Sequence, residues 1–194
     1  MKVVFITGKQ GSGKSYTANE LVTSNHAKCL DIDKVLNSGG KRYLTAERRE
    51  PTDWELWKEL SEHDDLLPVL RTAIAKTHGS LVGTCNNLIV DGAILCNTWF
   101  LDPFIEAMTS ALKLGDFSRD FVYVNASNQL ILDNVIHRAS RDRRRQRELE
   151  RFPNAEAVGD YHGGFDRAIA GDPKWNAHQT KEAAVEAVRQ ILAC

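Results

Sequence analysis

The sequence predicts an α/β protein with a doubly wound, mostly parallel sheet of five strands flanked by helices. Short apolar runs rich in β-branched residues alternate with segments of helical periodicity along the 194 residues. A glycine-rich turn follows the first run and opens the first helix. Acidic residues follow the second and third runs, where the carboxyl ends of parallel strands form a ligand site.

The expected strands are short, and the expected helices carry recognisable end signals. The strands cover residues 3–7, 29–32, 88–90, 121–124 and 165–170. Helix starts are indicated by a capping box at Thr52 and Glu55, by Asp65, by Asp102-Pro103 and by Ser127, and a helix end by Gly115. Apolar residues between 184 and 192 recur at helical spacing, which predicts a last helix.

Composition excludes several classes of protein. Twenty-five Lys and Arg against 26 Asp and Glu give a net charge of -1, so a generally basic nucleic-acid binder is excluded. No run approaches the roughly 18 apolar residues of a membrane helix. The four cysteines form no C-x-x-C pair and have no histidine at zinc-ligand spacing. We therefore expect one domain over residues 1–194, reduced thiols and a cytoplasmic location.

Residues 8–15 match the Walker A pattern G-x-x-x-x-G-K-[ST] and are called the phosphate loop below. The pattern predicts that backbone N–H groups of five residues surround phosphate oxygens: Gly8, Gln10, Gly11, Ser12 and Gly13. Lys14 is expected to reach the β- and γ-phosphates, and the Ser15 hydroxyl to ligate Mg²⁺. The predicted cofactors are therefore ATP and Mg²⁺.

Other motifs narrow the class of nucleotide-binding protein. The sequence has no N-K-x-D element for reading guanine. Asp91 is followed by Gly92 and not by the glutamate that activates water in motor ATPases. Transfer of a phosphoryl group to a bound acceptor is therefore favoured over hydrolysis.

Four segments in order resemble the P-loop kinases of small molecules and nucleotides. The first is the phosphate loop with its strand, residues 5–15. Residues 30–35 are similar to dephospho-coenzyme A and shikimate-type kinases, and residues 88–92 are similar to nucleoside monophosphate kinases. The last is residues 122–127, followed by Arg138 and Arg141. The resemblance implies a core of residues 1–33, 80–136 and 165–194. It also implies a helical acceptor-binding region at 34–79 and an arginine-rich lid at 137–164, called the candidate lid below.

Three carboxylates follow the second and third strands. The resemblance implies that Asp33 accepts the proton of the acceptor hydroxyl and that Asp31 lies near Mg²⁺. Asp91 is expected to hold a water molecule bound to Mg²⁺. The alternative is structural: Asp31 or Asp33 caps the next helix, and Asp91 is a turn residue before Gly92.

The segment 137–151 holds seven arginines and three acidic residues. Arg138 and Arg141 are three residues apart, so they share a helix face and could close on the transferring phosphoryl group. Three alternatives stay open: a solvated helix face, a nucleic-acid phosphate site and a disordered flap.

The sequence thus predicts an ATP- and Mg²⁺-dependent phosphotransferase acting on a small, nucleotide-like acceptor. One alternative is a kinase that acts on nucleic acid, with the arginine segment following the phosphates. The other is a regulatory P-loop NTPase without a small acceptor. The sequence names neither the acceptor nor the oligomeric state.

Overall fold

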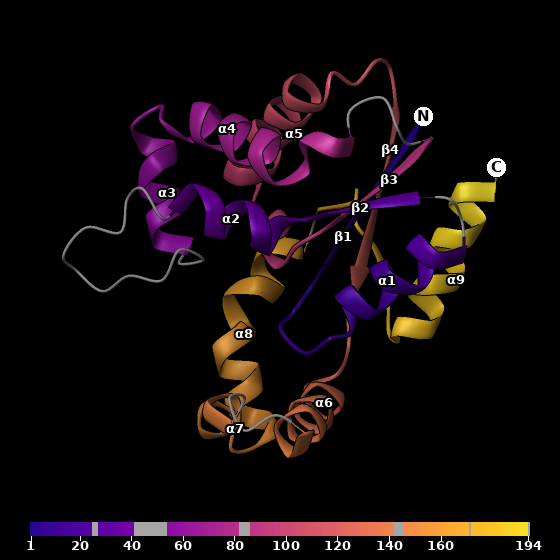
Figure 1. The fold of residues 1–194 in the computed structure, drawn as a ribbon. Coiled ribbons are helices and arrows are strands. Elements are labelled where there is room, and N and C mark those ends of the chain that lie inside the picture. Colours follow the sequence, from indigo (N-terminus) through magenta and orange to yellow (C-terminus); the bar gives the residue numbers. More distant parts are fainter. Residues whose placement is uncertain (25–26, 41–53, 82–85, 142–145, 171, 194) are drawn as a thin grey trace.

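The computed structural model describes residues 1–24, 27–40, 54–81, 86–141, 146–170 and 172–193 (Figure 1). Within these residues, five parallel strands form one sheet in the order β2-β3-β1-β4-β5. The strands are β1 (Lys2–Gly8), β2 (Ala27–Asp31), β3 (Asn87–Asp91), β4 (Ser118–Val124) and β5 (Asn176–His178). The predicted parallel sheet is confirmed, and β1 lies at its centre.

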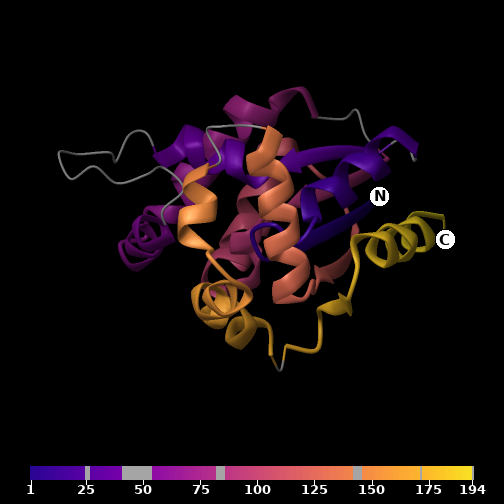
Figure 2. The same cartoon turned by 90° about the horizontal axis from the view of Figure 1, so that it is seen from below.

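Helices cover both faces of the sheet. They are α1 (Lys14–Ser24), α2 (Ile32–Gly40), α3 (Trp54–Glu62), α4 (Leu66–His78), α5 (Thr98–Leu112), α6 (Asn128–Arg141), α7 (Gln146–Arg151), α8 (Ala155–Ile169) and α9 (Lys181–Ala193), with short 3₁₀ turns η1 (Gly79–Leu81) and η2 (Ala93–Cys96). Helices α1 and α9 lie on one face, and α2 to α5 lie on the other (Figure 1). Helices α6, α7 and α8 gather at one end of the molecule (Figures 1 and 2).

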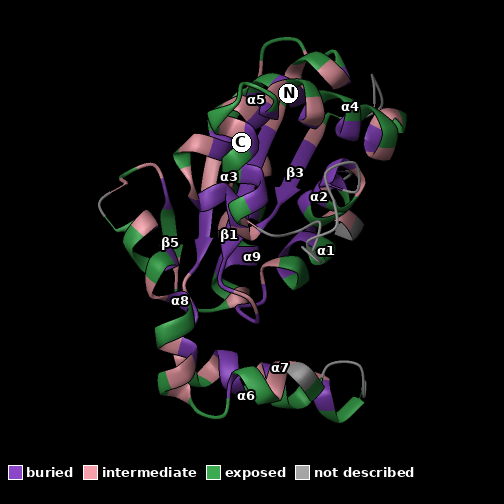
Figure 3. Cartoon of the chain, turned by 90° about the vertical axis from the view of Figure 1, so that its left-hand side faces the viewer, coloured by how far each residue is buried: buried purple, intermediate pink, exposed green. Residues whose placement is uncertain are grey.

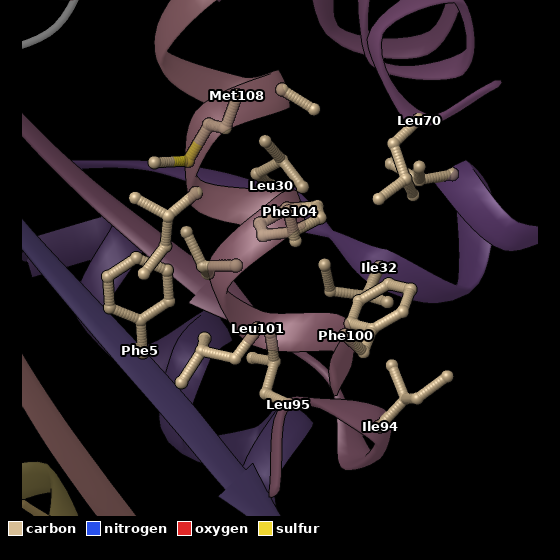
Figure 4. Packing of buried hydrophobic residues seen from close by; sticks show 14 of the residues in the cluster. Phe5, Leu30, Ile32, Leu70, Ile94, Leu95, Phe100, Leu101, Phe104 and Met108 are labelled. Carbon is tan, nitrogen blue, oxygen red and sulfur yellow. The ribbon is translucent and has the colours of Figure 1, made fainter. Parts of the chain in front are cut away.

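The central strand is apolar along most of its length because both of its faces are buried. Val4 and Ile6 join the cluster beneath α1 and α9. Phe5 joins the larger cluster beneath α4 and α5, where Phe104 and Met108 surround it (Figure 4). The strands are accordingly coloured as buried (purple) along much of the sheet in Figure 3.

A third cluster of buried residues lies within α6 to α8, apart from the sheet (Figure 3). Its buried members are Ala126, Ile131, Leu132, Val135, Phe152 and Val158. These three helices therefore have a small hydrophobic core of their own.

The expected strand at 165–170 is wrong, because these residues end α8. Phe165 and Ile169 are four residues apart and both buried, which fits one face of a helix. The fifth strand is β5, whose three residues carry little apolar surface. So short a polar strand has no period-2 apolar pattern to reveal it.

Helix ends agree only partly with the sequence signals. The Ser127 hydroxyl accepts from the Leu130 N–H at 3.2 Å and so caps α6 as predicted. Helix α4 begins after Asp65, but the Asp65 side chain makes no capping bond. The cap expected at Thr52 lies outside the described residues.

Helix α5 differs from the prediction at both ends. It begins at Thr98, four residues before the predicted Asp102, and Pro103 lies inside it. Phe100 and Leu101 are buried in the main core, which draws the extra turn into the helix. At the other end Lys113, rather than Gly115, takes the left-handed conformation, with φ 52°. No helix of the described segments is both long and apolar enough to cross a membrane.

Candidate active site

The phosphate loop connects the buried strand β1 to the first turn of α1. Gly11 and Gly13 have φ of +89° and +99°, a region that side chains disfavour. A Cβ at Gly11 would also lie 3.0 Å from Ile131, and one at Gly13 would lie 3.0 Å from Lys181. Both glycines are therefore required by the backbone. The turn presents its N–H groups at the start of a helix, which is the geometry of an anion site.

Lys14 and Ser15 stand at the start of α1, opposite the end of β3. The Ser15 hydroxyl hydrogen-bonds to the carboxylate of Asp91, which is buried. Burial raises the pKa of Asp91, whereas Lys14 and the Ser15 hydroxyl lower it. The other oxygen, Oδ1, is buried and has no hydrogen-bond partner among the described residues. Such an oxygen is available to a water molecule or a cation.

Asp33 lies in the first turn of α2. Partial burial raises the pKa of this carboxylate, the Lys14 ammonium lowers it, and the charge of Asp31 raises it. Lys14 therefore lies within electrostatic reach of both Asp33 and Asp91. The sheet brings these three predicted residues together: Lys14 begins the helix after β1, Asp33 lies in the helix after β2, and Asp91 ends β3.

Asp31 is the last residue of β2 and caps α2. Its Oδ1 accepts from the N–H groups of Asp33 at 3.0 Å and Lys34 at 3.4 Å, which satisfies donors at the start of the helix. The helix-cap alternative is therefore confirmed for Asp31. The Asp31 N–H in turn donates to the ring of the buried His78, at 3.3 Å. The role of Asp31 near Mg²⁺ stays a prediction.

The described residues that could hold a magnesium ion are Ser15 and Asp91. No group of three or more His, Cys, Asp or Glu side chains is placed to bind an ion within the described parts of the chain. Mg²⁺ commonly takes one or two protein ligands and completes its shell with water and substrate phosphates. The hydroxyl of Ser15 and the unpartnered oxygen of Asp91 fit that mode of binding.

Helices α6 to α8 contact the phosphate loop through polar side chains. Asn134 donates to the Gly11 carbonyl at 2.9 Å, and Gln10 donates to Glu148 of α7 at 3.4 Å. Arg138 and Arg141 lie in the last turn of α6, half-buried and exposed respectively. Neither arginine has an ion-pair partner in the described segments, so their predicted contact with phosphate stays a prediction. Residues 143–145 lie outside the described residues.

A second lysine of the phosphate loop was not predicted to have a role. Lys9 is only 4% exposed, and its ammonium pairs with Asp166 of α8 at 2.7 Å. The other oxygen of Asp166 accepts from the hydroxyl of Tyr123 in β4 at 3.2 Å. A lysine inside a phosphate-binding pattern is the one signal that could have drawn attention to this cluster. Asp166 itself belongs to an ordinary amphipathic helix.

A cavity of about 650 Å³ lies beside the phosphate loop. It is formed by the loop, β4, α8 and the segment that leads into β5. Its polar and aromatic lining comprises Lys9, Tyr123, Asn125, Asp166, Asp172 and Trp175. The ion pair of Lys9 and Asp166 is therefore part of the cavity wall.

The predicted acceptor-binding region contains α2, α3 and α4. Trp57 of α3 is fully buried and packs edge-on against Phe100 of α5, with ring centroids 6.2 Å apart. A Cβ at Gly39 of α2 would lie 2.7 Å from the Trp57 ring, so these helices pack closely. Trp57 is therefore a core residue that fixes the helices beside Asp33.

Comparisons with known proteins identify the fold. No family model and no curated protein matches the sequence. The tunicamycin resistance protein of Deinococcus radiodurans is similar in structure, with a TM-score of 0.54 and 17% identity over 99% of this chain and 93% of that one. Shikimate kinase from Bacteroides thetaiotaomicron has a TM-score of 0.53 and 14% identity over 100% and 99%. The structure of deoxyadenosine kinase from M. mycoides with bound dATP has a TM-score of 0.52 and 13% sequence identity, over 100% of both chains.

The predicted fold is confirmed: the chain has the α/β fold of P-loop kinases. Solved structures with this fold include kinases of small molecules, such as the shikimate and deoxyadenosine kinases. The similarity covers this chain from the first strand to the last helix.

Proposed function

We propose that the protein is an ATP- and Mg²⁺-dependent phosphotransferase that moves the γ-phosphoryl group of ATP to a small, nucleotide-like acceptor. The observation that carries the proposal is the arrangement around Lys14. Its ammonium lowers the pKa of both Asp33 and Asp91, and Ser15 hydrogen-bonds to Asp91. A phosphate-binding lysine, a proton acceptor and a magnesium-holding pair are the groups that phosphoryl transfer needs.

Each residue has a stated role in this proposal. The phosphate loop and Lys14 hold the triphosphate, and Ser15 with Asp91 holds Mg²⁺, which would neutralise charge on the β- and γ-phosphates. Asp33 orients the acceptor hydroxyl and takes its proton; its raised pKa brings it closer to that of a general base working near neutrality. Arg138 and Arg141 of the candidate lid stabilise the transferring phosphoryl group.

The domain organisation follows from the same proposal. Residues 34–79 bind the acceptor, residues 137–164 form the lid, and the remainder is the core. Helix α8 continues through residue 164, so the lid would be rigidly joined to the core by this helix. A cytoplasmic location is also proposed, from the sequence pattern of cysteines without C-x-x-C pairs.

The test is a screen for ADP release with ATP and Mg²⁺. Acceptors would include nucleoside monophosphates, dephospho-coenzyme A, sugar acids and oligonucleotides. ADP release that depends on one small acceptor and on Mg²⁺ is expected. Release that requires an oligonucleotide and weakens steeply with salt would favour the nucleic-acid kinase. Release without any acceptor, stimulated by another protein, would favour the regulatory NTPase.

A further inference from the structure

A buried histidine in α8 contacts the phosphate loop. His162 is 5% exposed, and its ring stacks on Phe152 at a centroid distance of 5.8 Å. The ring also hydrogen-bonds to the backbone of Gln10, inside the phosphate loop. The Nε2 atom is buried without a hydrogen-bond partner among the described residues. A buried polar atom without a partner costs free energy, and such atoms are few in folded proteins.

The charged groups that act on His162 come from the phosphate loop and from α8, and Arg151 of α7 lies over the ring of Tyr161, which contacts His162 edge-on. Lys9 and Lys14 approach from the phosphate loop, and Asp166 approaches from one turn further along α8. Glu148 of α7 reaches the same loop through Gln10. Burial is the largest cause that lowers the pKa of His162, and the charge of Lys9 is the next. Asp166 acts in the opposite direction, and the resulting pKa is about 4. The imidazole is therefore neutral near pH 7, between two ammonium groups and one carboxylate.

The two lysines of the loop are already matched by acidic groups. Buried lysines are rare unless paired, and Lys9 is paired with Asp166. Lys14 is the other ammonium of the loop, and it interacts electrostatically with Asp33 and Asp91. A bound triphosphate would add negative charge near the ring. That negative charge would raise the pKa of the ring, and a phosphate oxygen would accept a hydrogen bond from the protonated Nε2.

We propose that His162 is a phosphate-sensing residue that takes up a proton from solvent when a nucleoside triphosphate enters the phosphate loop. The inference rests on the proposed function for the presence of a nucleotide, and it adds a residue that the loop pattern does not contain. The proton adds to Nε2, and no bond to phosphorus forms. The resulting imidazolium donates toward the phosphates and joins Lys9 and Lys14 as a third positive group, which ties α8 to the bound nucleotide.

The test is isothermal titration calorimetry of the full chain with Mg²⁺ and a non-hydrolysable ATP analogue. Titrations in buffers of different protonation enthalpy, at several pH values between 6 and 8, count the protons taken up on binding. We expect roughly half to one proton more for the wild type than for His162→Gln near pH 6, with affinity falling as pH rises. The matched control is His178→Gln, a partly exposed histidine at the end of β5 and outside the phosphate loop and the candidate lid, which should behave as the wild type.

A second measurement uses the wild type alone, in case His162→Gln does not fold. In protein with isotope-labelled histidine, the His162 ring signal should titrate with a pKa of about 4 without nucleotide. It should move above roughly 6 with the analogue bound. An unchanged ring pKa, or equal proton uptake by wild type and His162→Gln, overturns the inference.

These outcomes separate the inference from the proposed function. Proton uptake at His162 without ADP release in any acceptor screen contradicts the phosphotransferase and leaves the inference standing. Acceptor-dependent ADP release with no proton uptake at His162 does the reverse. A wild type that binds no nucleoside triphosphate contradicts both.

Discussion

Asp31 and Asp91 lie directly opposite each other in the register of β2 and β3, and each is the last residue of its strand. Two carboxylates on neighbouring strands repel, and the charge of Asp31 contributes to the raised pKa of Asp91. Lys14 and the Ser15 hydroxyl offset part of this repulsion. The ionised form of Asp91 is therefore destabilised at the end of the sheet, and a bound cation would stabilise it.

Asp91→Asn should stabilise the protein without ligands while removing its activity. A carboxyl whose pKa is raised on folding favours the folded state most below the unfolded pKa of about 3.8 and loses that contribution as pH rises. Removing the charge should therefore raise Tm at pH 7, by about 2–4 °C for each kcal/mol recovered. Calorimetry would measure Tm, and ADP release should fall roughly 100-fold or more.

The matched control for this prediction is Asp102→Asn, which neutralises an exposed carboxylate on α5. It should change neither Tm nor activity. A lower Tm for Asp91→Asn than for the wild type would mean that the Ser15 hydrogen bond outweighs the repulsion.

Lys14→Ala should reduce turnover by roughly 1,000-fold, because the triphosphate loses its main positioning charge. Lys14 also lowers the pKa of Asp33 and Asp91, so both carboxylates become harder to ionise in the variant. Steady-state ADP release measures the change. Lys28→Ala, at an exposed position of β2, is the control, and turnover that survives in Lys14→Ala would refute the assigned site.

Asp33→Asn should lower kcat by roughly 100-fold or more while changing the KM for ATP little, because a proton acceptor acts in the transition state. The pH profile gives an independent readout. In the wild type, kcat should rise with pH as Asp33 loses its proton, at a pKa above the usual value for aspartate. In Asp33→Asn this rise of kcat with pH should be absent. An unchanged kcat would remove Asp33 as the base.

Arg138→Ala and Arg141→Ala should lower turnover by roughly 10-fold or more each and leave Tm nearly unchanged, because neither guanidinium has an ion pair in the described segments. Turnover and Tm would be measured on the same preparations. A large loss of Tm with normal turnover would make these arginines structural.

Stability toward acid should depend on His162. Its pKa is about 6.5 unfolded and about 4 folded, so its neutral form favours folding above pH 6.5, and that contribution falls as pH drops toward 4. Between pH 6.5 and pH 4, the free energy of unfolding should lose about 3 kcal/mol through this residue. Denaturant unfolding at pH 4 to 7 should therefore show a shallower pH dependence for His162→Gln than for the wild type. Equal slopes would contradict the buried, neutral state of the ring.

The sequence predicts the sheet and the phosphate loop well, because each depends on residues close together along the chain. Strand β1 is a continuous apolar run, and the loop pattern needs only eight residues. The contact of Lys9 with Asp166 could not be predicted, because the two residues are far apart in the sequence and no motif surrounds Asp166. His162 was missed for the same reason. The predicted strand at 165–170 failed because a short apolar run fits a helix and a strand equally well.

Helices α6 to α8 enclose a hydrophobic cluster that is separate from the two clusters of the sheet. The separation is incomplete, because Phe165 and Ile169 of α8 belong to the main cluster and Ile131 of α6 lies against Gly11. Polar links add to these contacts: Asn134 with Gly11, Gln10 with Glu148, and Lys9 with Asp166. Any sub-global opening of α6 to α8 would therefore leave the last turns of α8 with the sheet, and its free energy would include apolar contacts as well as charge and hydrogen bonding.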